Sequence, residues 1–203
     1  MNATIIPIGQ TCNITFLLQN AKLKKQTSLF EWFVSNRLNH ITDILNKIVT
    51  KTDNTIITAT HRYIYIGNEN IYSEHYKLDE FKDIYIRRRD RLLETIQEST
   101  SILFIRFEGS IIINNYTHKE IDEFISIIRK INPSLEKITL LLITNNPIKL
   151  EHPSVVEVFY NKHSSDPMCT GAEINTIFIN ALRSVGYDTT NTITTIFTDK
   201  SYI

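Results

Sequence analysis

Two almost uninterrupted apolar runs constrain the fold of this chain more than any other feature of its sequence. They are residues 101–107, Ser-Ile-Leu-Phe-Ile-Arg-Phe, and residues 138–144, Ile-Thr-Leu-Leu-Leu-Ile-Thr. Each run has the length of a strand and is apolar on both faces, so it needs cover on both sides. Such strands are typical of parallel sheets that helices cover on either face. Residues 4–8 and 155–160 are expected to add two further strands.

Amphipathic helices are expected between these strands, because apolar residues recur in the intervening segments at spacings of three and four. The pattern predicts an α/β fold, a three-layer sandwich with a mainly parallel central sheet of Rossmann-like or SGNH-like type. The 203 residues suffice for one such core, so we expect a single domain over residues 1–203. The expected helices cover residues 14–21, 38–48, 79–98, 121–128 and 174–185.

One segment departs from this alternation of strands and helices. Between residues 55 and 76 the apolar period changes to two, with Tyr63 and Tyr65 on one face and Ile64 and Ile66 on the other. A period of two is that of a half-buried strand, and the polar residues that follow suit a turn. We therefore predict a β-hairpin insertion near residues 55–76.

Composition excludes several classes of function. The 22 basic and 22 acidic residues balance, so no overall field attracts nucleic acid. No apolar run approaches the roughly 18 residues of a membrane span, and no basic flank precedes a long apolar segment at the N-terminus. Two cysteines are too few for a disulfide framework. We expect a soluble protein of the cytoplasm, the host cytoplasm if the source is viral, without nucleic-acid or membrane partners. The oligomeric state is left open.

The motifs give no support to cofactor chemistry. Gly-x-Gly-x-x-Gly and the phosphate loop that ends in Gly-Lys-Ser/Thr are both absent. No two Cys/His pairs have metal-ligand spacing, and no arginine follows Cys12 within ten residues, as a tyrosine-phosphatase loop requires. We expect neither a cofactor nor a metal.

The predicted fold locates the candidate site. In open parallel sheets, ligands gather at the carboxyl ends of strands, near a reversal of strand order. The segments that follow the predicted strands are residues 9–13, 106–109, 144–146 and 161–166. Reactive side chains are therefore expected along this edge of the sheet.

Cys12 is the candidate nucleophile. It follows Gly9 in a turn after the first strand and stands where a helix should begin. Helix N-termini stabilise anions, which is expected to lower the pKa of the thiol. An activated thiolate would attack an acyl carbon; a small apolar residue that fills space is the other interpretation. Gln10 and Asn13 flank Cys12 as candidate oxyanion- or substrate-binding groups.

Two histidines compete for the role of general base. His75 follows the predicted hairpin and has the carboxylates of Glu74 and Asp79 nearby in the chain. His163 follows the last predicted strand, three residues before Asp166. That is where the topology would place a base and the group that orients it. The residues alone do not rank the two.

Two arginines stand at apolar positions. Arg88 falls within the apolar stripe of the helix at 79–98, and Arg106 lies inside a buried strand. A buried cation needs a partner, and we expect Glu31 or Glu108 to pair with Arg88. Arg106 would bind a substrate anion or an oxyanion, or else form a structural ion pair, which is the commoner role.

The single tryptophan, Trp32, lies in a dense aromatic segment, residues 28–34. It is expected to pack in the core beneath the site. The alternative is a wall on which a substrate stacks.

Five short motifs occur in order along the first half of the chain. They are Ile8-Gly9-Gln10-Thr11-Cys12, Ser28-Leu29-Phe30-Glu31-Trp32, His75-Tyr76, Arg88-Arg89-Asp90-Arg91-Leu92 and Ile102-Leu103-Phe104-Ile105-Arg106-Phe107-Glu108-Gly109. Together they resemble a domain family of unknown function whose members, from bacteria and large DNA viruses, are regarded as papain-like cysteine peptidases. That family's pattern is a glycine-x-x-cysteine start, a Pro-Phe-Asp-Trp segment, a His-Asp-Phe, a double arginine on a helix and a strand reading Leu-Phe-Val-Arg.

The resemblance implies a peptidase with Cys12 as nucleophile, His75 as base and Glu31 at the family's aspartate position. The chain departs from the family in three places: Leu29 replaces the proline, Glu31 replaces the aspartate, and Tyr76-Lys77 replaces the Asp-Phe that follows the histidine. A papain-like domain packs its cysteine helix against an antiparallel barrel, whereas the periodicity here predicts a parallel sheet. We follow the periodicity, because one site recurs on unrelated folds.

Three functional hypotheses follow. A cysteine-dependent hydrolase or acyl transferase, a peptidase among them, would use Cys12 with His75, or with His163 and Asp166. An SGNH-like esterase or carbohydrate-modifying enzyme would use the same sheet edge, although that family's Asp-x-x-His signature is absent from the last third of the chain. A non-catalytic interaction or host-modulating domain would use the edge of the aromatic hairpin. The acyl or peptide substrate stays unspecified.

Overall fold

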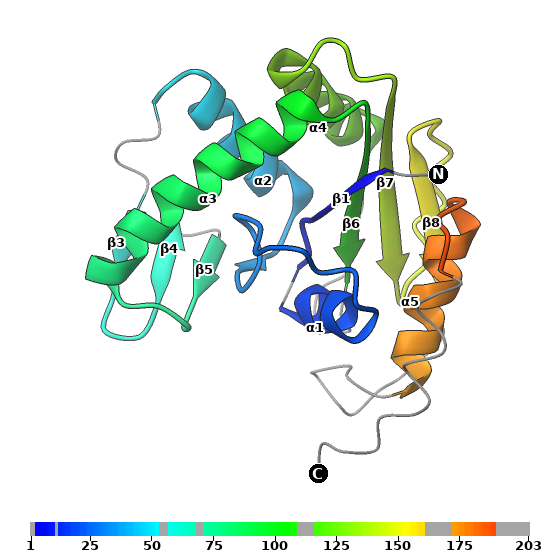
Figure 1. The fold of residues 1–203 in the computed structure, drawn as a ribbon, viewed down its shortest axis with the longest axis horizontal. Helices are drawn as coiled ribbons and strands as arrows, with labels where there is room; N and C mark the ends of the chain where they lie inside the picture. The colour runs from blue at the N-terminus through cyan, green and yellow to red at the C-terminus, as the bar shows by residue number, and fades with distance from the viewer. Residues whose placement is uncertain are drawn as a thin grey trace.

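The computed structural model of this protein describes residues 3–10, 12–52, 57–67, 71–108, 116–160 and 172–189. Within these ranges the chain forms five helices and two four-stranded sheets, one parallel and one antiparallel (Figure 1). The predicted α/β class with a parallel sheet is confirmed.

The parallel sheet is built from the strands that the apolar runs predict. Its members are β1 (Thr4–Pro7), β6 (Ser101–Phe107), β7 (Lys137–Thr144) and β8 (Val155–Phe159). The order is β1-β6-β7-β8, and every neighbouring pair is parallel. β6 and β7 are buried along almost their whole length because both of their faces are apolar. These four strands cross the sheet in chain order, so the expected reversal does not occur among them.

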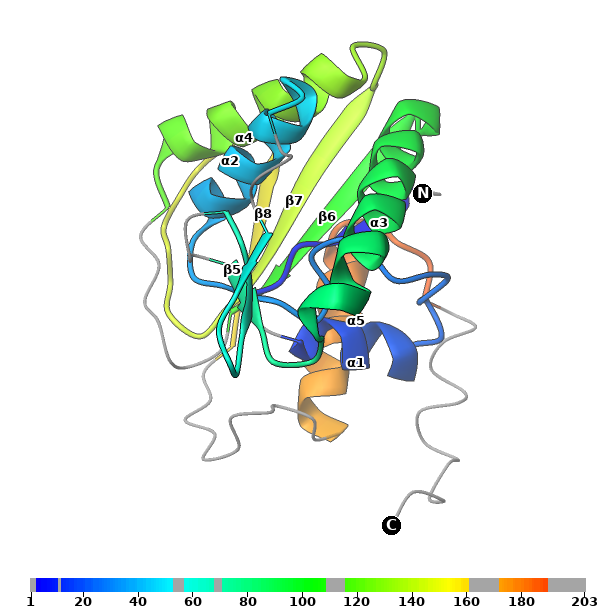
Figure 2. The same ribbon diagram turned by 90° about the vertical axis from the view of Figure 1, so that its left-hand side faces the viewer.

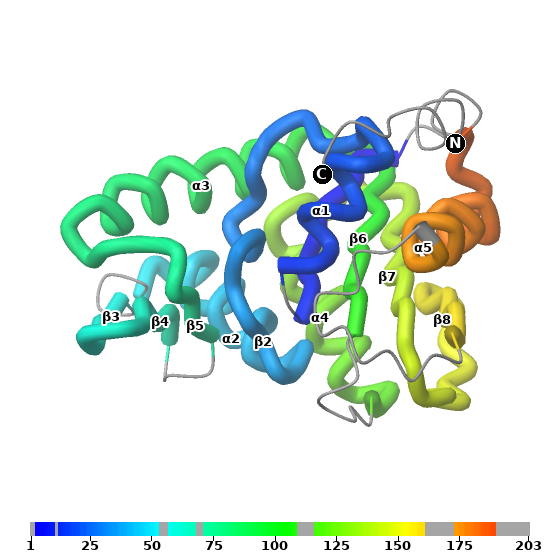
Figure 3. Tube along the Cα trace, turned by 90° about the horizontal axis from the view of Figure 1, so that it is seen from below, coloured from blue at the N-terminus to red at the C-terminus, as the bar shows by residue number. Residues whose placement is uncertain are grey.

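Helices lie against both faces of this sheet. Side chains of β6 alternate, so Ile102 and Phe104 join one apolar cluster while Leu103 and Ile105 join the other. Helices of the first cluster are α2 (Leu38–Val49), α3 (Leu78–Glu98) and α4 (His118–Ile131). Those of the second are α1 (Asn13–Asn20) and α5 (Ala172–Ser184). Figure 2 shows α2 beside α4, and Figure 3 shows α5 beside β7 and β8.

The helices begin and end near the positions that the apolar spacing predicts. α4 starts after Thr117, whose hydroxyl accepts the Glu120 amide while the Glu120 carboxylate accepts the Thr117 amide, a capping box. α3, at 21 residues, carries charged side chains along its length. Among the described residues, no helix combines the length and the apolar character needed to cross a membrane.

The antiparallel sheet is larger than the predicted hairpin. Its members are β2 (Val34–Ser35), β3 (Ile57–Ala59), β4 (Ile64–Ile66) and β5 (Ile71–Ser73). Its order is β2-β5-β4-β3, so a strand from the aromatic segment extends the insertion to four strands. The predicted alternation holds, since Ile64 and Ile66 are buried while Tyr63 and Tyr65 are half-buried. Figure 1 shows this small sheet beyond one end of the parallel sheet, below α3.

Candidate functional site

Cys12 lies between β1 and α1, at the predicted edge of the parallel sheet. Its carbonyl accepts the Thr15 amide at 2.9 Å, so it begins the helix as expected. The side chain is half-buried. Burial raises the pKa of the thiol, the Cys12 amide partly opposes this, and the Glu74 carboxylate raises the pKa further. The predicted lowering of the Cys12 pKa is therefore wrong, and the group is a thiol at neutral pH that needs a base to ionise it.

Trp32 connects the helix of Cys12 with the loop of His75. Its ring centroid lies 5.4 Å from that of Phe16, one turn along α1 from Cys12, and 5.2 Å from that of His75. Lys24 Nζ lies 5.4 Å from the same tryptophan centroid. The backbone of Trp32 has a φ of 68°, in the left-handed region that bulky residues rarely adopt. Trp32 is half-buried, so it forms a wall of this region instead of packing wholly inside the core.

His75 occupies the short loop between β5 and α3, and its side chain is exposed. Its amide donates to Ser73 Oγ at 3.2 Å. The neighbouring Glu74 forms an exposed ion pair with Arg62 at 3.5 Å, and its charge also acts on Cys12. The Glu74 charge thus connects the His75 loop with Cys12, and the role of His75 as the base stays a prediction.

The rival base, His163, and its partner Asp166 lie outside the described residues, as does the second cysteine, Cys169. The choice between His75 and His163 therefore stays a prediction.

Glu31 is buried behind Trp32 and is engaged by two groups. Its Oε1 accepts the Ser28 amide at 2.5 Å, and its Oε2 lies 2.9 Å from Lys24 Nζ. The carboxylate is only 1% exposed, which a cation at this distance compensates. Glu31 therefore ties the aromatic segment to the residues that follow α1.

Arg88 pairs with a phenol and not with the predicted carboxylate of Glu31 or Glu108. Its Nη1 donates to the Tyr76 hydroxyl at 2.8 Å, and its guanidinium carbon lies 5.2 Å from the Tyr76 ring centroid. Burial raises the pKa of Tyr76, and Arg88 partly opposes this rise. The phenol is therefore neutral at physiological pH and does not compensate the charge of Arg88.

Arg106 is completely buried and is held from several directions. Its Nε donates to Tyr116 Oη at 2.7 Å and to Glu108 Oε1 at 3.1 Å. Its Nη1 donates to the Ile8 carbonyl at 3.0 Å and to Ser35 Oγ at 2.9 Å, and Nη2 donates to the Ser35 carbonyl at 2.8 Å. Burial opposes the charge, but Tyr116 and Glu108 outweigh it and the pKa of Arg106 rises. Of the two roles expected for Arg106, the structure shows the commoner one, a structural ion pair with Glu108.

Glu108 completes this network. Its carboxylate accepts the hydroxyl of Tyr116 as well as Arg106 Nε, and its carbonyl accepts the Tyr160 hydroxyl at 2.7 Å. The side chain is 3% exposed. Glu108 therefore serves the buried cluster and is closed to a substrate.

Gln10 and Asn13, the expected oxyanion- or substrate-binding groups, are both 2% exposed. The backbone N–H of Gln10 donates to the Phe107 carbonyl at 3.3 Å, and the backbone carbonyl of Gln10 accepts the backbone N–H of Ser35 at 2.9 Å. Two strands from distant parts of the chain thus fix the backbone immediately before Cys12.

Sequence reasoning missed Lys24, Ser35, Tyr76 and Tyr116, which partner the buried or half-buried charges. Tyr76 gave a usable signal, because it replaces the family's aspartate close to an arginine-bearing helix. No local pattern marks Lys24, Ser35 or Tyr116 as a partner of a buried charge.

The described residues do not assemble a metal centre. Within these ranges, no three His, Cys, Asp or Glu side chains gather so that they could hold a metal ion. The expectation of a protein without metal or cofactor stays an expectation.

The fold and this site define an α/β protein with a half-buried cysteine and an exposed histidine loop at one sheet edge. The sequence matches no model of a protein family, and no solved structure matches it. It is similar to the uncharacterized protein R408 of Acanthamoeba polyphaga mimivirus, with 26% identity over 174 residues that cover 70% of this chain and 77% of that protein. The chain thus has a distant relative in a large DNA virus, and the resemblance to papain-like peptidases stays a prediction.

Proposed function

We propose that this protein is a cysteine-dependent hydrolase or acyl transferase in which Cys12 is the nucleophile and His75 its base. The observation that carries the proposal is the convergence of the α1 start, Trp32 and the loop before α3. The charge of Glu74 acts on the Cys12 thiol, and the His75 ring packs against Trp32. An exposed ring on this loop is free to reorient, as catalytic groups do when substrate binds.

The raised pKa of Cys12 decides the order of steps. His75 takes the Sγ proton as Sγ attacks the acyl carbon, and returns it to the leaving group when the tetrahedral intermediate collapses to a thioester. Water then cleaves the thioester in a hydrolase, and another nucleophile does so in a transferase. Because Arg106 and Gln10 are both enclosed, the developing oxyanion falls to the first backbone amides of α1.

The finer fold assignment belongs to the same proposal. Helices against both faces of the parallel sheet support a three-layer sandwich of Rossmann-like or SGNH-like type. An SGNH-like esterase would share this sheet edge but would draw its base from the segment of His163 and Asp166.

The test is hydrolysis of p-nitrophenyl acetate by protein in which Cys169 is replaced by serine, so that Cys12 is the remaining thiol. Cys12→Ala and His75→Ala are each expected to lower the rate about 100-fold or more, because each removes one half of the nucleophile and base pair. His61→Ala is the matched control, an exposed histidine near the same small sheet. Equal rates for the His75 and His61 variants, or an unchanged rate for Cys12→Ala, would overturn the proposal.

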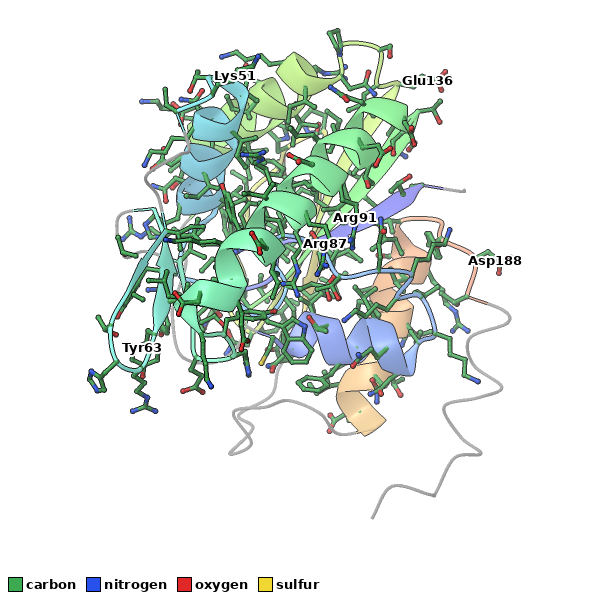
Figure 4. The ribbon with its side chains drawn as sticks, turned by 60° about the vertical axis from the view of Figure 1, so that its left-hand side comes forward. Lys51, Tyr63, Arg87, Arg91, Glu136 and Asp188 are labelled. Carbon is green, nitrogen blue, oxygen red and sulfur yellow. The ribbon has the colours of Figure 1, made fainter. Side chains whose placement is uncertain are left out.

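A second candidate function, a non-catalytic interaction domain, is favoured by one surface. Tyr63, Tyr65 and Tyr72 are half-buried, and their ring centroids lie 5.3 to 6.2 Å apart. Arg62 lies 5.1 Å from the Tyr63 ring, and Figure 4 shows Tyr63 at the outer end of the small sheet. Tyrosine clusters of this kind are enriched at protein interfaces.

The two candidates separate in one binding experiment. Capture of a host protein that is lost in Tyr65→Ala and Tyr72→Ala but kept in Cys12→Ala and His75→Ala would favour the interaction domain. Capture that is lost in Cys12→Ala but kept in Tyr65→Ala and Tyr72→Ala would favour the enzyme.

A further inference from the structure

A cleft runs along the outer edge of β1. Among the described strands, β1 pairs only with β6, and its other side faces the segment after α1 and the second half of α3. Two cavities of about 400 Å³ and about 50 Å³ occupy this space. Both are lined by Ile5, Pro7, Gln26 and Thr95, so they adjoin along the strand.

The larger cavity has an apolar floor and a polar rim. Its volume lies within the range of about 300–1,000 Å³ that is usual for ligand pockets. The rim carries Thr4, Gln26 and Tyr187. The floor is formed by Ala3, Ile5, Pro7, Leu18 and Leu23.

Charged side chains line the two cavities unevenly. They are Lys24, Lys25, Arg88 and Arg91, against the single carboxylate of Glu31. Lys24 and Glu31 compensate each other at 2.9 Å. The other three cations are therefore in excess over the carboxylates of these walls.

The contacts of the two arginines leave this excess in place. Arg91 Nη1 donates to the Thr27 carbonyl at 3.4 Å, and Arg88 donates to the Tyr76 phenol. Both acceptors are neutral, so they orient the guanidinium groups without cancelling their charge. Lys25 is exposed at the rim. Figure 4 shows Arg91 and Arg87 on the side of α3 that faces β1.

Strained backbone flanks the wall of the cleft on both sides along the chain. Lys22 and Trp32 have φ values of 54° and 68°, and they bracket the wall segment that contains Lys24, Lys25 and Glu31. Non-glycine residues in the left-handed region cost free energy and concentrate at binding sites, where the surrounding structure holds them in place.

We propose that this cleft binds a small amphiphilic anion, a chain of a few carbons that ends in a carboxylate or a phosphate. The chain lies on the apolar floor, and the anionic end meets either Lys25 at the rim or Arg88 and Arg91 in the adjoining small cavity. Beyond Thr95 the adjoining hollow is lined by three carboxylates, Asp90, Glu94 and Glu98, and by Arg87 and Arg91, so it attracts an anion less than the cleft does. This proposal does not depend on the chemistry of Cys12.

Calorimetric titration with four probes tests it. Hexanoate and hexyl phosphate each carry both required parts, whereas hexanol lacks the charge and inorganic phosphate lacks the chain. We expect one or both amphiphiles to bind at least about fivefold more tightly than either partial probe, and their relative affinities identify the head group.

Variants locate the site. Lys25→Glu reverses an exposed charge at the rim and is expected to weaken binding of the amphiphile about fivefold or more. Lys22→Glu, an exposed lysine of the same segment that lines neither cavity, is the matched control and should change affinity less than about twofold. Arg91→Gln keeps a donor for the Thr27 carbonyl but removes a charge, and it should weaken binding as well.

Several results would overturn the proposal. If hexanol bound as tightly as the amphiphiles, the cleft would be only an apolar cavity. If inorganic phosphate bound as tightly, the site would be only a surface anion site. If no probe bound at millimolar concentration, the cleft would not be a binding site for these ligands. Equal effects of Lys25→Glu and Lys22→Glu would place the ligand elsewhere. Cys12→Ser must leave the affinity unchanged, so failure of the proposed acyl chemistry and failure of this site are distinguishable.

Discussion

Two polar clusters lie at the carboxyl edge of the same sheet and differ in how fully their groups are engaged. Around Arg106, the hydrogen bonds end on buried partners in or beside β1, β2, β6 and α4. Around Cys12, the thiol is half-buried, His75 is exposed, and the Trp32 ring lies between their segments. The first cluster is built like a core and the second like a site.

The difference between the two clusters shows that burial decides whether a polar residue near a strand end has a structural role. Arg106 and Glu108 lie on the same side of the chain, where other elements cover them. Both side chains are buried, and each charge is stabilised there by the other. Cys12 and His75 keep access to solvent, which the proposed acyl chemistry requires. A charged side chain at the carboxyl edge of a parallel sheet is therefore weak evidence of catalysis unless part of it stays exposed to solvent.

The largest expected effect breaks the buried cluster. Arg106→Met leaves Glu108 buried without its cation, and we expect the free energy of unfolding to fall by about 3–5 kcal/mol. Urea denaturation measures it. Arg62→Met, which removes the exposed pair with Glu74, is the control and should cost less than about 1 kcal/mol. Similar losses in the two variants would contradict the structural assignment of Arg106.

An intermediate effect on the free energy of unfolding is expected at Arg88, which is less buried than Arg106 and less exposed than Arg62. Tyr76→Phe removes the hydroxyl that accepts Arg88 Nη1 but keeps the ring, and should cost about 1–2 kcal/mol in the same denaturation assay. Arg88→Met should then cost less in the Tyr76→Phe background than in the wild type, because the pair is already broken. Strict additivity would show that the two side chains are not coupled.

The smallest effect sharpens the account of Cys12. The Glu74 carboxylate raises the pKa of the thiol, so Glu74→Gln should lower that pKa and speed alkylation by iodoacetamide at about pH 7.5 in a Cys169→Ser background. The gain should stay below about tenfold and shrink in about 1 M salt, because Glu74 is exposed and screened.

Glu80→Gln is the control for this measurement, since Glu80 is an exposed carboxylate in the first turn of α3. In the Cys169→Ser protein with Glu74 intact, the alkylation rate of Cys12 should rise with pH through a midpoint above that of a free cysteine. A midpoint below that of free cysteine would restore the lowered pKa that the helix start suggests.

Much of the fold follows from local pattern. The strand at 101–107 and its apolar alternation are visible without any partner, because a strand that is buried on both faces has no polar face. The helices likewise follow from apolar spacing, and Cys12 falls at the start of α1 as a turn after a strand requires. The position of Cys12 was therefore predictable from local pattern, whereas the loop of His75 was singled out only by the family resemblance.

Partners were not predictable, since they depend on distant contacts. Arg106 meets Ser35 across 71 positions of the chain and the Ile8 carbonyl across 98. The pKa of Cys12 was misjudged for the same reason: the helix start is a local feature, whereas burial and the Glu74 charge come from the tertiary fold. The choice of Tyr76 for Arg88 likewise depends on how the loop before α3 folds back.

The pairing of β1 with β6 bears on how the chain is made. Thr4 stands opposite Ile102 and Pro7 opposite Ile105, so β1 has no neighbour in its sheet until about a hundred further residues are synthesised. Contacts of such long range slow folding and leave apolar surface open in the meantime. Ile6 and Ile8, both buried in the finished protein, therefore stay open to solvent until β6 is made and pairs with β1.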